Sequence, residues 1–66
     1  MLPIDIMYKI RSYSHIVTLA QYQKLEEIQD TLLYSIESVN IDIVTGLLWY
    51  QTRDGRYSID KYGEVS

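Results

Sequence analysis

The chain contains no cysteine, no phenylalanine, one proline and three glycines among its 66 residues. Without cysteine it has neither disulfide bonds nor thiolate metal ligands. It has no run of about 20 apolar residues, so we expect no membrane-spanning helix. Because a chain of this length buries only about 60% of its unfolded surface, its stability must depend on good packing or on a partner.

Acidic residues outnumber basic ones, nine to six, which gives a net charge of −3. This balance disfavours non-specific binding to nucleic acid or to anionic membranes. The first residues, Met1 to Asp5, lack the basic-then-apolar layout of a signal peptide. We therefore expect a cytoplasmic protein, located in the host cytoplasm if the source is a virus.

The beginning of the chain has helical periodicity. Pro3 suits the first helical position, and Ile6, Met7 and Ile10 follow at spacings that place them on one face. Together they predict a helix over about residues 3–13.

A second helix is predicted over about residues 18–39. Thr18 and Gln21 have the spacing of a capping box, in which each residue hydrogen-bonds to the backbone of the other. Apolar residues then recur every three or four positions: Tyr22, Leu25, Ile28, Leu32, Ile36 and Val39. A break near Gln23 would give three helices instead of two.

The end of the chain has the pattern of strands. Short apolar, partly β-branched segments predict strands over about 41–44, 47–53 and 56–61. Asp54-Gly55 between two such segments is a strong hairpin signal. Whether 41–44 pairs with the hairpin stays open. We predict an α+β fold in one domain, 1–66: two or three helices, then a two- or three-stranded antiparallel hairpin or meander.

If Asp54 and Gly55 are the two loop residues, the register of the hairpin follows. Arg53 would lie opposite Arg56. One face would carry Leu48, Tyr50, Tyr57 and Ile59 and pack on the helices. The other face would carry Leu47, Trp49 and Gln51, with Tyr62 beside Trp49.

No residues have a pattern typical of catalysis. The only histidine, His15, is in no nucleophile motif. Glu26, Glu27 and Asp30 lie within about one helical turn, which is more typical of a solvated face than of a metal site. We expect no catalytic residues, no metal ligands and no cofactor.

The residues predicted to contact a partner are Trp49, Tyr62, Leu47, Arg53 and Arg56. The first three would form an exposed aromatic patch, and two guanidinium groups at a hairpin tip could hold a phosphate or a carboxylate. In the alternative interpretation, the sheet is covered on both sides and Trp49 is a core residue. Independently of this, the alternative for the two arginines is that they only keep the hairpin end soluble.

Two families share features with this chain. Helices followed by a hairpin with the tip Arg53-Asp54-Gly55-Arg56 resemble a winged helix-turn-helix domain over residues 18–60, which implies a DNA-binding transcriptional regulator. The helix that would enter the major groove is acidic, a departure better suited to protein binding. Leu2-Pro3-Ile4-Asp5-Ile6, with Ile10, Ser12 and Tyr13, resembles the opening of an F-box, except that Ser14 stands where that family tends to have leucine.

Taken together, these features indicate a small acidic, non-enzymatic protein–protein interaction module. We expect a protein partner, self-association or both, and neither nucleic acid nor a membrane as ligand. An accessory protein of a phage or virus that inhibits or scaffolds a larger protein would have these properties. The alternative is the DNA-binding regulator that the winged-helix resemblance implies.

Overall fold

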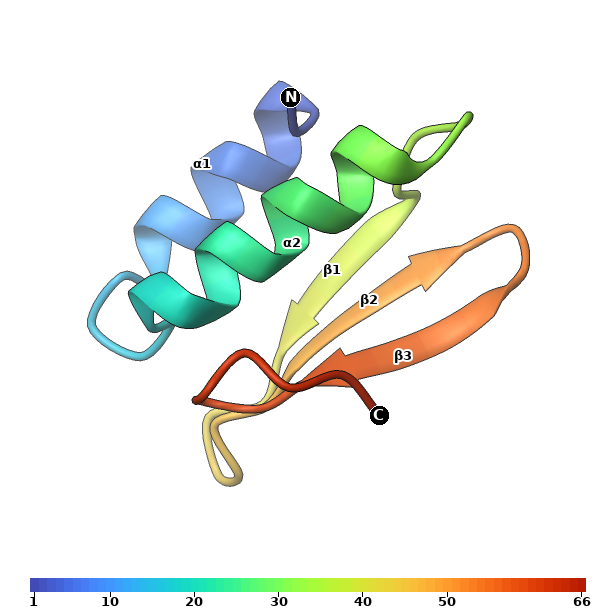
Figure 1. Ribbon diagram of the computed structural model, residues 1–66. Coiled ribbons are helices and arrows are strands. Elements are labelled where there is room, and N and C mark those ends of the chain that lie inside the picture. Colours follow the sequence, from blue (N-terminus) through green and yellow to red (C-terminus); the bar gives the residue numbers. More distant parts are fainter.

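Two helices pack on one face of a three-stranded antiparallel sheet. The computed structural model describes residues 1–66 and contains helices α1 (Ile4–Ser12) and α2 (Leu19–Thr31), followed by strands β1 (Ser38–Ile41), β2 (Leu48–Thr52) and β3 (Gly55–Ile59). The strand order is β1-β2-β3, and α1 contacts β1 while α2 contacts β3 (Figure 1). The α+β prediction, with helices first and an antiparallel sheet after them, is confirmed.

Helix α1 agrees with the predicted range to within one residue at each end. Pro3 is the residue before the first helical turn, with φ −54° and ψ 145°. Ile6 and Ile10, one turn apart, are the buried residues of α1, while Met7 packs against the edge of the core. Asp5 in the first turn and Lys9 and Arg11 in the last turn have the signs that the helix dipole favours.

Helix α2 begins at the predicted capping box. The backbone N–H of Gln21 donates to Thr18 Oγ1 at 3.1 Å, and the backbone N–H of Thr18 donates to Gln21 Oε1 at 2.9 Å. The Gln21 side chain is 1% exposed, and its amide nitrogen also donates to the carbonyls of Gly46 (2.7 Å) and Ile59 (3.1 Å). One glutamine therefore joins the start of α2 to both the loop before β2 and the end of β3.

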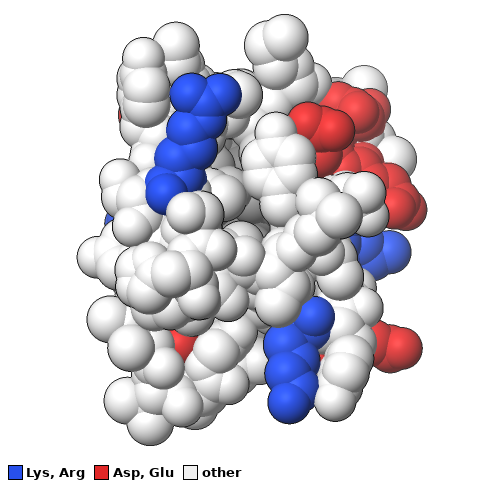
Figure 2. All heavy atoms as spheres, turned by 90° about the vertical axis from the view of Figure 1, so that its left-hand side faces the viewer, with Lys and Arg blue, Asp and Glu red and all other residues white.

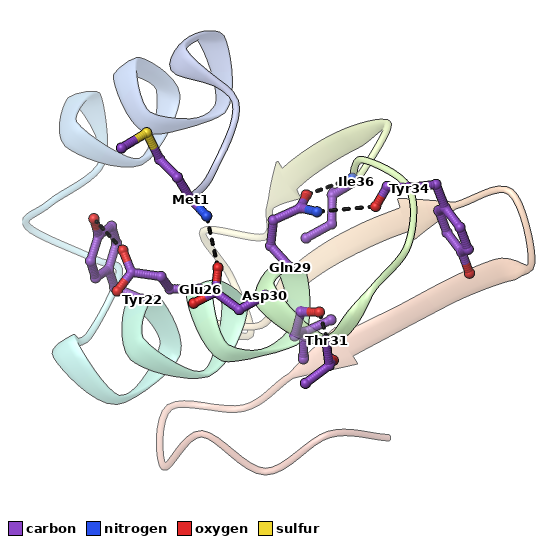
Figure 3. A network of polar contacts seen from close by, with 9 residues as sticks. Met1, Tyr22, Glu26, Gln29, Asp30, Thr31, Tyr34 and Ile36 are labelled. Atoms are coloured by element: carbon purple, nitrogen blue, oxygen red, sulfur yellow. Dashed lines mark hydrogen bonds and ion pairs between the residues drawn. The ribbon is translucent and has the colours of Figure 1, made fainter.

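The prediction that the second helix continues to Val39 is wrong beyond Thr31. Leu32 already has extended dihedrals, φ −83° and ψ 143°. The buried side chain of Gln29 holds the chain that follows: its amide donates to the carbonyl of Tyr34 (3.0 Å) and accepts from the N–H of Ile36 (2.8 Å) (Figure 3). The three-residue spacing of Ile36 and Val39 fits a helix, but both side chains enter the core from an extended segment.

Strand β1 is Ser38–Ile41, not the predicted 41–44, and it does pair with the hairpin. Val39 lies opposite Tyr50 and Ile41 opposite Leu48. Residues 42–46 form a turn instead of a strand. In this turn the Asp42 carboxylate accepts the N–H groups of Val44 (3.0 Å) and Thr45 (3.2 Å).

The β2–β3 hairpin has a different register from the predicted one. Thr52 pairs with Gly55, so the loop residues are Arg53 and Asp54. Thr52 Oγ1 accepts the N–H of Asp54 at 3.1 Å, and Gly55 has φ +154°, a value that residues with a Cβ rarely adopt. Because the register differs from the prediction by an even number of residues, the side chains within β2 and β3 stay on their predicted faces.

The core lies between the helices and the inner face of the sheet. Leu25 of α2, Leu48 of β2 and Ile59 of β3 are fully buried at its centre. The other buried apolar residues around them are Leu2, Ile6, Ile10, Ile36, Val39 and Tyr50. Neither helix is long and apolar enough to cross a bilayer.

Candidate binding surface on the open sheet face

The helices cover only one face of the sheet, and the side chains of the opposite face form the candidate site. Side chains alternate between faces along each strand, so the register defines two rows on the uncovered face. Ser38, Gln51 and Arg56 form one row. Asn40, Trp49 and Ser58 form the next. We call these six residues the open sheet face. Ser58, on its β3 edge, is buried, and its backbone exchanges two hydrogen bonds with that of Ser66.

Arg56 and Trp49 are the prominent pair on this face. The guanidinium carbon of Arg56 lies over the Trp49 ring, 4.9 Å from its centroid, in cation–π geometry. Trp49 is half-buried and Arg56 is exposed. Arg56 takes part in neither of the two ion pairs of the chain. Its guanidinium therefore lies over the indole, and its N–H groups remain free to bind an acceptor.

A shallow hollow of about 200 Å³ lies on the open sheet face. It is bounded by Ser38, Asn40, Trp49, Tyr50, Gln51 and Arg56. Arg56 is the only charged residue among these six. The exposed amides of Asn40 and Gln51 add neutral donors and acceptors beside it. The hollow thus offers one cation and several neutral polar groups around a large aromatic side chain.

The structure separates Arg53 and Arg56, which the predicted register placed opposite each other. Arg56 lies opposite Gln51, whereas Arg53 is in the loop. The Arg53 guanidinium lies over the ring of Tyr34, 4.3 Å from its centroid. The Tyr34 hydroxyl donates to the Asp54 carboxylate, and this hydrogen bond raises the pKa of Tyr34 above its ordinary value. Each guanidinium rests on a different ring, so the predicted two-arginine anion grip is not formed.

Tyr62 and Leu47 also differ from the prediction. Trp49 lies opposite Ser58, and Tyr62 lies in a turn beyond β3, where the Asp60 carboxylate accepts its N–H at 2.9 Å. The Tyr62 side chain is 74% exposed, with the Lys61 ammonium 5.2 Å from the ring centroid. Leu47 is half-buried just before β2. Of the five predicted contact residues, Trp49 and Arg56 are the ones that the structure brings together.

The sequence did not single out Ser38, Asn40 or Gln51 as site residues. Gln51 could have been found, because it is two residues from Trp49 in an alternating strand and must share its face. Ser38 and Asn40 were hidden by the predicted helix over 18–39. Because residues 38–40 were assigned to a helix, the two-residue alternation of a strand was not applied to them. That alternation would have placed Ser38 and Asn40 on the face of Trp49.

The remaining polar residues do not assemble a chemical centre. No group of three or more His, Asp or Glu side chains converges in a way that could hold a metal ion. His15 is exposed in the turn after α1, where its ring stacks on that of Tyr13 with centroids 6.3 Å apart. It takes part in no ion pair.

The chain belongs to the α+β class, with two helices on one face of a three-stranded sheet and the other face not covered by a helix. No family model, no curated protein and no solved structure matches it.

Proposed function

We propose that this chain is a small non-enzymatic protein-binding module and that the open sheet face is its binding surface. The observation that carries the proposal is Arg56 stacked on the half-buried ring of Trp49, on a sheet face that no helix covers. Tryptophan and arginine are the residues most enriched among those that dominate protein–protein binding energy. Because the two side chains already contact each other, part of the side-chain ordering that a partner would require is in place before it binds.

The chemistry of the face suggests what the partner supplies. The guanidinium of Arg56 presents a planar fork of donors that matches a carboxylate. Asn40 and Gln51 can bind backbone or side-chain amides beside it. We infer that the partner segment places an aspartate, a glutamate or a chain-terminal carboxylate over Arg56, with an apolar side chain against Trp49.

We also propose a biological role for this module. A chain of 66 residues with a net charge of −3 suits an accessory protein that inhibits or scaffolds a larger protein, including one from a phage or virus. Its acidic surfaces outside the open sheet face would steer it toward basic regions of such a target.

The test begins by finding the protein that contacts the open sheet face. A photo-crosslinking residue at Gln51 should capture a protein that the same residue at Val44 does not capture. Val44 is a suitable control because it is 94% exposed and lies in the β1–β2 turn. The captured protein is then purified and titrated against the chain. Trp49 is the only tryptophan of this chain, so the change in fluorescence on mixing, after subtraction of the emission of the partner alone, follows the open sheet face.

Matched variants make this titration specific. Trp49→Ala and Arg56→Ala should each weaken binding at least about tenfold, as expected for residues that dominate an interface. Trp49→Ala is followed by anisotropy of a dye on the partner. Lys61→Ala removes one exposed positive charge that also lies over an aromatic ring, so it is the control for Arg56→Ala. Equal losses for the two charge variants would show that overall charge, not the open sheet face, governs binding.

A further inference from the structure

A second uncovered surface lies on the outer side of the two helices. Four large apolar residues are exposed there: Met1 (91%), Ile4 (68%), Tyr8 (60%) and Leu19 (69%). Met7 and Arg11 lie among them. We call these six residues the helical face. Contiguous apolar surface of this kind is uncommon on monomeric proteins and marks interaction sites.

The helical face is hollowed rather than flat. One hollow, of about 350 Å³, lies between the end of α1 and the start of α2. Another, of about 300 Å³, lies along α1 beside Met1. Met7 and Arg11 border both, so the two hollows adjoin. Figure 2 views the molecule from the side where α1 lies and shows a broad uncharged surface. One basic side chain lies at its upper left and another at its lower right, and acidic side chains gather mainly along its right-hand edge.

The charges around this face are incompletely paired within one chain. Glu26 and Asp30 are one turn apart on α2, an arrangement in which like charges repel. The Met1 amino group lies 2.7 Å from Asp30, whereas Glu26 has only the Tyr22 hydroxyl, at 3.3 Å (Figure 3). Arg11 takes part in no ion pair. One chain therefore presents both an unpaired cation and an unpaired carboxylate beside the same apolar surface.

We propose that the helical face is the interface of a homodimer, in which Arg11 of each copy lies against Glu26 of the other. In a two-fold dimer the same surface is used by both subunits, so it must be complementary to itself. The helical face meets this requirement because it carries an unpaired charge of each sign around apolar hollows. A basic partner would leave Arg11 facing a like charge, and an acidic partner would do the same to Glu26.

The small core of the chain also favours a second copy as the partner of the helical face. Its core contains only nine buried apolar residues, and four large apolar residues are left exposed on the helical face. A stable interface covers about 800 Å² on each partner, roughly a fifth of the 4461 Å² of surface of this chain. An interface of that share would leave the open sheet face free on the opposite side of each copy.

Sedimentation velocity on the full chain, over a range of concentrations, tests the dimer. The expected result is a species of twice the 7.8 kDa chain mass. Ile4→Glu and Tyr8→Glu should each yield monomers with an unchanged circular dichroism spectrum, because both side chains are already exposed. Val44→Glu adds the same charge at an exposed apolar residue away from the helical face and should leave the dimer intact.

A charge exchange tests the pairing of Arg11 with Glu26. Arg11→Glu and Glu26→Arg should each weaken dimerisation at least about tenfold, the range seen for close charge pairs at interfaces. An equimolar mixture of the two variants should dimerise again, because both cross-subunit pairs are then of opposite sign. A mixture that stays monomeric would overturn the pairing.

Two results would overturn the dimer itself. One is a wild-type chain that remains monomeric up to about 1 mM, where even a weak association would be populated. The other is a dimer that survives both Ile4→Glu and Tyr8→Glu but is lost on Gln51→Glu, which would place the contact on the open sheet face.

Discussion

The side-chain amide of Gln21 donates to the carbonyl of Ile59 at 3.1 Å, across 38 positions in the sequence. The same nitrogen donates to Gly46, and the amide oxygen accepts from Thr18. Every polar atom of this buried side chain is therefore satisfied. The contact fixes the start of α2 on the sheet, and with it the geometry of the helical layer.

Gln21→Leu should destabilise the fold by roughly 3 kcal/mol. It leaves the buried carbonyl of Ile59, the part-buried carbonyl of Gly46 and the part-buried N–H of Thr18 without their partner. Urea denaturation followed by circular dichroism measures this change in the free energy of unfolding. Gln23→Leu is the matched control: the same substitution on an exposed residue of the same helix should change stability by less than about 0.5 kcal/mol. Similar effects of the two substitutions would contradict the role given to Gln21.

Gly63→Ala should cost more stability than Gly46→Ala. Both glycines have positive φ, +86° and +77°, so each substitution imposes about 1–2 kcal/mol of backbone strain. A Cβ at Gly63 would also lie 3.1 Å from the carbonyl oxygen of Ala20, whereas a Cβ at Gly46 meets nothing within 4 Å. Thermal unfolding of the two variants should therefore give the lower Tm for Gly63→Ala. The opposite order would mean that the turn after β3 does not pack on the start of α2.

Asp42 should make stability depend on pH in the acid range. Hydrogen bonds from Thr45, backbone and side chain, and from the backbone of Val44 hold the pKa of this carboxyl below its ordinary value of 3.8. A depressed folded-state pKa contributes stability above pH about 4, and this contribution is lost as the pH falls through the folded-state pKa. Relative to Asp42→Asn, the wild-type chain should lose stability as the pH drops below about 4. Parallel urea midpoints for both chains from pH 6 to pH 2 would contradict this.

We expect no binding to duplex DNA. Arg56 is the only charge on the open sheet face, Arg53 lies over Tyr34, and α2 carries Glu26, Glu27 and Asp30. Anisotropy of a fluorescein-labelled duplex should stay constant as the chain is added, at low and at physiological salt. Binding that weakens as salt rises would instead support the DNA-binding regulator implied by the winged-helix resemblance.

Several parts of the fold follow from patterns within a few residues. The capping box of Thr18 and Gln21 gave the start of α2, since both of its hydrogen bonds span only three residues. The four-residue spacing of Ile6 and Ile10 correctly predicted the buried side of α1. Alternation along β2 gave the correct face for Leu48, Tyr50 and Trp49, even though the predicted register was wrong.

The site was harder to predict because its parts come from three strands. Trp49 and Arg56 were both expected to contact a partner, but their stacking depends on a register that differs from the prediction by two residues. Ser38 and Asn40 join them only because the chain leaves the helix at Thr31.

The sequence by itself determined the helix starts, the inward and outward sides of each element and the acidic character of the surface, because each depends on periodicity, composition or hydrogen bonds between near neighbours. Tertiary structure alone decided where α2 ends, which residues pair across the hairpin and what each arginine contacts. Those outcomes depend on contacts that span more than one helical turn of sequence, from seven residues for Gln29 and Ile36 to twenty for Tyr34 and Asp54. Gln29 holds the chain at Ile36, and Tyr34 contacts Arg53 with its ring and Asp54 with its hydroxyl. No local pattern specifies such partners, because the free energy of each contact is gained only after the rest of the core has formed.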